Sequence, residues 1–131
     1  MRLEVTTKIV IMFVSVALAF TVIDLLTTYV AVSGGAQELN PTIANDIVSF
    51  GLVNALLLSL ITPLLASTVS VSGSIICNRT INTVELKGFT LKGRRNLKLF
   101  VSIGLAALLT VVIITRGLAV CNNTFQFLGV V

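Results

Sequence analysis

The sequence predicts an all-α integral membrane helical bundle with three transmembrane helices, the amino terminus inside the cell and the carboxyl terminus outside. Of its 131 residues, 56% are hydrophobic and only 11% are charged, whereas a water-soluble protein carries roughly 25% charged residues. The chain therefore has too few charges to cover a surface in water. We expect a single membrane domain over residues 1–131, with spans near 9–32, 47–70 and 97–121.

The first apolar run extends from Ile9 to Val32 and contains Asp24. About 20 apolar helical residues are enough to cross the hydrocarbon core, so the run is predicted to be a span. Arg2 and Lys8 precede it, as basic residues precede the apolar segment of a signal peptide. Such a segment has only about 7–15 residues, however, and this run is longer and includes a carboxylate. We therefore expect the run to be retained.

The second apolar run follows Asn40-Pro41, a pair typical of a helix start because Asn caps free N–H groups and Pro suits the first helical position. Pro63 lies inside the run and lacks a backbone N–H, which predicts a kink or a break. Either the helix passes through to about residue 70, or Pro63 turns a re-entrant hairpin back to the starting side.

The distribution of basic residues favours the first arrangement. Six of the nine lie in or beside the segment 77–96, which we expect to be a cytoplasmic loop facing anionic lipid: Arg79, Lys87, Lys92, Arg94, Arg95 and Lys98. Three spans place this segment and the basic amino terminus on one side, as the positive-inside rule requires. The hydropathy makes a lipid bilayer with anionic headgroups the expected partner, and no nucleic acid.

Polar residues inside the predicted spans form the candidate site. Placing the ionisable side chain of Asp24 inside a membrane costs free energy, which makes it a candidate functional residue. Thr27 and Thr28 lie beside it in the first span. Counted from the outer helix ends, Asn54 and Arg116 lie at nearly the same depth as Asp24. We expect one polar cluster of these five residues. The alternatives are a structural carboxylate bonded to the threonines, and an Arg116 that reaches the outer headgroups without a partner.

The remaining composition excludes several kinds of chemistry. The chain has no histidine and two cysteines, so His-based triads and zinc sites are not expected. We expect no cofactor and no enzyme activity. Small residues at four-residue spacing, as in Ser15/Ala19 and Ser102/Ala106, favour close helix packing or self-association. The predicted class is an accessory subunit of a membrane complex or a structural component of a cellular or viral envelope, located in the plasma membrane or in a viral or host membrane. The alternative is a small transporter or ion-binding oligomer that uses Asp24 and Arg116.

One stretch carries a resemblance to a family: Asp24-Leu-Leu-Thr27-Thr28-Tyr29 followed by Gly34-Gly35-Ala-Gln-Glu38-Leu-Asn40-Pro41. It resembles small prokaryotic, largely archaeal, membrane proteins of unknown function, which have an Asp and a Thr near the end of the first helix and then a Glu-x-Asn-Pro turn. The resemblance implies a helical multi-pass fold and no particular activity. In physical terms, Glu38, Asn40 and Pro41 form a loop motif at the outer mouth, above Asp24.

Overall fold

The computed structural model describes residues 4–38, 40–83 and 90–128 and confirms the predicted all-α class. Its helices are α1 (Val5–Ser33), α2 (Pro41–Phe50), α3 (Leu52–Ser59), α4 (Ile61–Thr83) and α5 (Leu91–Phe127). Three helical stretches are long and apolar enough to cross a membrane: Val5–Ser33, Leu52–Thr83 and Leu91–Gln126. The described part of the chain is thus compatible with a multi-pass membrane protein.

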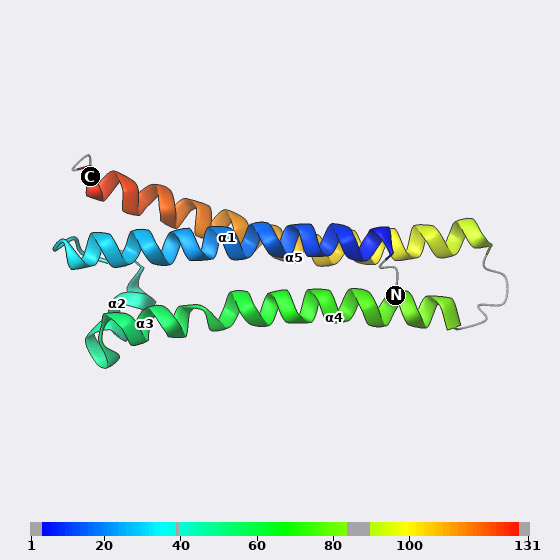
Figure 1. Ribbon diagram of the computed structural model, residues 1–131, viewed down its shortest axis with the longest axis horizontal. Coiled ribbons are helices and arrows are strands. Elements are labelled where there is room, and N and C mark those ends of the chain that lie inside the picture. Colours follow the sequence, from blue (N-terminus) through cyan, green and yellow to red (C-terminus); the bar gives the residue numbers. More distant parts are fainter. Residues whose placement is uncertain (1–3, 39, 84–89, 129–131) are drawn as a thin grey trace.

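The three long stretches form an elongated bundle (Figure 1). Helix α1 packs against both α4 and α5, and these two also pack against each other. The short helices α2 and α3 lie at the end of the bundle where α1 and α5 finish (Figure 1). We call this the Arg116 end, and the opposite end, where α4 finishes and α5 begins, the Lys98 end.

The buried faces of the helices are rich in small and polar residues, and large apolar side chains point outward. On α4 the buried residues follow helical spacing: Pro63, Ser67, Ser70, Ser74, Asn78 and Ile81. Exposed apolar side chains occur on every long helix, for example Leu26 on α1, Leu65 on α4 and Phe100 on α5. A soluble bundle has the opposite arrangement. The apolar exterior therefore suits contact with lipid.

The centre of the bundle is a small apolar core of Val10, Ala17 and Leu109, all fully buried. Ser102 and Ala106, one of the small pairs noted in the sequence, are buried on the same helix as Leu109. Ser15 and Ala19 are exposed, so this second pair takes no part in packing within the chain. Small side chains thus bring α5 close to its neighbours, while the α1 pair faces outward.

The helical stretch that corresponds to the second predicted span, Leu52–Thr83, differs from the predicted 47–70 at both ends. Helix α2 is separate from α3 because Gly51 between them has φ 81° and ψ 158°, a conformation in which a helix cannot continue. The apolar stretch therefore starts at Leu52, and it extends through a Ser-rich segment to Thr83. Hydropathy identifies helix segments that can face lipid. It does not identify a helix that continues because its small polar residues face the bundle interior, as in the Ser-rich part of α4.

The predicted interruption near Pro63 is present. Helix α3 ends at Ser59, Leu60 forms a turn, and α4 starts at Ile61. Beyond this break α4 does not turn back but continues toward the Lys98 end (Figure 1), which excludes the re-entrant hairpin.

The predicted loop 77–96 is also shorter than expected among the described residues. Residues 77–83 belong to α4 and residues 91–96 to α5, whose first turn is capped by the Thr90 hydroxyl accepting from the Gly93 N–H at 3.2 Å. Lys87 lies outside the described residues. Arg79, Lys92 and Arg95 are exposed and Arg94 is half-buried. Lys98 does not face lipid as predicted, because it is paired inside the bundle.

Candidate functional site

Asp24 lies on the buried face of α1, toward the Arg116 end. Its side chain is only 3% exposed. A buried carboxylate destabilises a protein unless a cation or hydrogen-bond donors compensate its charge. Both of its oxygens have such a partner on α5: Oδ2 accepts from Arg116 and Oδ1 accepts from Asn123.

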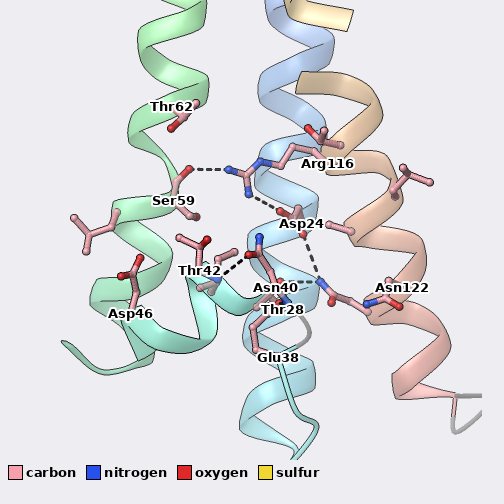
Figure 2. A pocket seen from close by; sticks show the side chains of 16 residues that line it. Asp24, Thr28, Glu38, Asn40, Thr42, Asp46, Ser59, Thr62, Arg116 and Asn122 are labelled. Atoms are coloured by element: carbon pink, nitrogen blue, oxygen red, sulfur yellow. Dashed lines mark hydrogen bonds and ion pairs between the residues drawn. The ribbon is translucent and has the colours of Figure 1, made fainter. Parts of the chain in front are cut away.

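Arg116 connects three helices. Its Nη1 donates to Asp24 Oδ2 on α1 at 2.6 Å, and its Nη2 donates to the Ser59 backbone carbonyl at the end of α3 at 2.7 Å. Figure 2 shows the guanidinium lying between these two acceptors. Because its planar fork can serve two acceptors at once, one side chain from α5 holds both α1 and α3.

Pro63 explains why the Ser59 carbonyl can accept this bond. In a continuous helix the N–H of residue 63 would donate to the carbonyl of residue 59. Proline has no N–H, so this carbonyl loses its usual partner. The Arg116 guanidinium takes that place from a different helix. The helix break and the ion pair are thus parts of one arrangement.

Asn123 is a buried member of the cluster that the sequence did not identify. Its Nδ2 donates to the Thr28 hydroxyl at 2.7 Å and lies 3.4 Å from Asp24 Oδ1. Asn123 follows Arg116 by seven residues, or almost two full helical turns, so both side chains point from the same face of α5. That spacing was a signal available in the sequence.

The structure brings together four of the five residues predicted to cluster and leaves out Asn54. The Thr27 hydroxyl donates to the Asp24 backbone carbonyl at 3.0 Å, at the margin of the cluster. Asn54 is exposed and donates to the Phe50 carbonyl at 2.9 Å. Its predicted depth assumed a helix continuous from residue 45. Gly51 ends that helix, so Asn54 lies in the first turn of α3, where it is exposed and does not line the pocket beside Asp24.

A pocket of about 620 Å³ lies beside the Asp24–Arg116 pair, between α1, α3 and α5. Residues of the predicted loop motif and of α2 form one of its walls: Glu38, Asn40, Thr42, Ile43 and Asp46 (Figure 2). The motif is held by local hydrogen bonds, since Glu38 accepts from the Asn40 N–H at 2.8 Å and Asn40 caps α2 at Thr42. Pro41 occupies the first position of α2, as predicted.

The pocket carries an excess of negative charge. Asp24 and Arg116 both line the pocket, and their opposite charges neutralise each other. Glu38 and Asp46 line the remaining wall, and neither forms an ion pair with any residue that the structure describes. The wall formed by α2 and its preceding loop is therefore acidic.

A second polar layer lies near the Lys98 end. Lys98 donates to Glu4 at 3.0 Å and to the Asn82 side-chain oxygen at 2.6 Å, and Asn82 also donates to Glu4 at 2.9 Å. Hydrogen bonds from Asn82 and Lys98 hold the pKa of Glu4 below its ordinary value of 4.5. One turn further in, the buried Asn78 side chain donates to Thr7 at 2.8 Å. This layer also joins all three long helical stretches.

The fold and the site define a helical bundle with three potential membrane spans, joined by a buried ion pair at one end and a half-buried one at the other. Within residues 4–38, 40–83 and 90–128, no group of three or more His, Cys, Asp or Glu side chains is placed to hold a metal ion. No protein family model, curated protein or solved structure matches the chain.

Proposed function

We propose that the protein is a non-catalytic multi-pass membrane protein that acts as an accessory subunit of a membrane complex or as a structural component of an envelope. One observation carries the proposal: the Asp24–Arg116 pair bonds to groups of its own chain. Arg116 serves Asp24 and the Ser59 carbonyl, and Asp24 accepts from Arg116 and Asn123. Groups used in this way fasten helices together.

The outer surface supports assembly with other membrane proteins. Ser15 and Ala19 form a small-residue pair on an exposed face of α1, where a neighbouring helix could approach closely in lipid. The test is purification of the tagged chain from its membrane in mild detergent, followed by cross-linking. A complex of fixed stoichiometry supports the proposal. A chain that elutes and cross-links only as a 13.9 kDa monomer contradicts it.

We also propose the orientation in which the Lys98 end faces the cytoplasm and anionic lipid. The exposed basic residues Arg79, Lys92 and Arg95 lie toward that end, whereas the charged residues at the other rim, Glu38 and Asp46, are acidic. Positive charge is retained on the cytoplasmic side of membrane proteins. The resemblance to small prokaryotic, largely archaeal, membrane proteins remains a prediction.

A second candidate function is cation binding at the acidic pocket, as part of a small transporter or ion-binding oligomer. The observation that favours it is that Glu38 and Asp46 line a pocket of about 620 Å³ and form no ion pair with a described residue. Proteoliposomes test it directly through uptake of radioactive rubidium or methylammonium. Uptake that disappears in the variant Glu38→Gln/Asp46→Asn would replace the structural proposal, and equal uptake by protein-free liposomes would remove the transport candidate.

A further inference from the structure

Helices α2 and α3 form an arm, residues 41–59, that packs on α1 and α4 only through α3. The arm is bounded at one end by the loop before Pro41 and at the other by the turn at Leu60. Among the described helices, α2 packs only on α3, and α3 packs only on α2, α1 and α4. Among the described residues the backbone of the arm does not approach that of α5, and the hydrogen bond from Arg116 to the Ser59 carbonyl joins the two.

The turn at Leu60 has the properties of a hinge. The hydrogen-bond pattern tightens between α3 and α4, where the Leu60 N–H donates to the Leu57 carbonyl, and Pro63 cannot donate the usual helical bond to Ser59. A hinge is a short segment of this kind, in which a few backbone dihedrals change while the flanking helices stay rigid. The bond from Arg116 to the Ser59 carbonyl lies beside this turn and fixes its angle.

The position of the arm determines how open the pocket is. Asp46 and Thr42 of α2 line one wall, and Asn122 of α5 lines the opposite wall (Figure 2). A rotation at Leu60 moves the first wall and leaves the second in place, because α5 is held by its long contact with α1.

We propose that α2 and α3 form a lid that turns about Leu60 and that the hydrogen bond from Arg116 to the Ser59 carbonyl is the latch that holds it closed. This conformational device goes beyond the proposed function and is independent of what occupies the pocket. The latch is one charge-assisted hydrogen bond, so its loss raises the ratio of open to closed lid by about tenfold.

Electron–electron distance measurements between spin labels test the lid. The labels are placed at Ser49→Cys on α2 and Thr124→Cys on α5, both exposed and outside the pocket. The native cysteines are replaced by Ser, and the protein is reconstituted in lipid bilayers. The parent is expected to give one narrow distance distribution. The variant Arg116→Gln is expected to add a second population with a longer distance between the labels. The matched control Lys98→Gln removes a cation from the far end of the same helix and is expected to keep the single narrow distribution.

Pro63→Ala provides the second arm of the experiment. It restores an N–H that donates to the Ser59 carbonyl, so α3 and α4 should join and the distribution should stay narrow with or without Arg116. Where Arg116→Gln does not fold, Arg116→Lys keeps the charge beside Asp24 and loses the second donor, and it should show the longer population. An unchanged distribution in the Arg116 variants, or a longer population that persists in the Pro63→Ala background, overturns the proposal.

Discussion

Arg116 and Asp24 are separated by 92 positions in the chain and by 2.6 Å between Nη1 and Oδ2. Their bond closes the Arg116 end of the bundle, and the Glu4–Lys98 pair closes the other end. Eighteen residues separate Lys98 from Arg116 on α5, which corresponds to about 27 Å of helix. The hydrocarbon core of a bilayer is about 30 Å thick, so the two ion pairs frame a layer of nearly that thickness.

The strength of the Asp24–Arg116 pair can be measured by a double-mutant cycle. Asp24→Asn and Arg116→Gln each leave one charge buried without its partner, and each should lower the free energy of unfolding by about 3 kcal/mol. The double variant removes both charges and should lose less than the sum of the two. Helix content followed by circular dichroism during titration with sodium dodecyl sulfate gives these values. Strictly additive losses would show that the two side chains do not interact.

Asn123 should contribute to stability and its neighbour Asn122 should not. Asn123 is buried and bonded to Thr28 and Asp24, whereas Asn122 is half-buried and has no hydrogen bond from its side chain among the described residues. Asn123→Ala should cost about 1–2 kcal/mol in the same titration. Asn122→Ala is the matched control. Equal losses from both substitutions would argue against the role given to Asn123.

Gly51 and Gly104 should respond in opposite directions to substitution by Ala. A Cβ atom would meet no neighbour within 4 Å at either position, but only Gly51 has a positive φ, of 81°. Gly51→Ala should destabilise the junction of α2 and α3 by about 1–3 kcal/mol. Gly104 lies inside α5, where Ala is favoured by about 1 kcal/mol. Hydrogen exchange measured by mass spectrometry should quicken over residues 41–50 in Gly51→Ala alone; unaltered exchange there would contradict the assigned backbone conformation.

The ion pair at the Lys98 end should make stability depend on pH in the acid range. The folded-state pKa of Glu4 lies below its ordinary value of 4.5. The stabilisation is therefore fully present above pH 4.5 and is lost as the pH falls through the folded-state pKa. Because the Glu4 side chain is 37% exposed, the step should not exceed about 1 kcal/mol. Thermal unfolding from pH 7 to pH 3 should show a smaller loss of stability in Asn82→Ala and in Glu4→Gln than in the parent. A loss as large as the parent's in both variants would exclude Glu4 as its source.

The sequence predicted the features that depend on long apolar runs and on how far a residue lies from the end of its helix. Apolar runs located the three helical stretches that are long and apolar enough to cross a membrane, and counting residues from the helix ends placed Arg116 near Asp24. Depth alone could not exclude Asn54, because Gly51 has a backbone conformation that only the structure reveals. It also could not identify the Ser59 carbonyl, since a backbone acceptor freed by Pro63 carries no side-chain signal. Asn78 and Ser74 were missed because small polar residues that face a bundle interior look like a loop when hydropathy alone is considered.

Cysteine labelling tests most directly the claim that Leu52–Thr83 crosses the membrane. Asn45→Cys on α2 and Lys92→Cys on α5 are exposed positions on either side of this stretch. In intact cells carrying a chain without its native cysteines, a membrane-impermeant maleimide should modify Cys at position 45 and should reach position 92 only after permeabilisation. Modification of both positions from the same side would contradict the three-span bundle, and with it the level at which Asp24 and Arg116 meet.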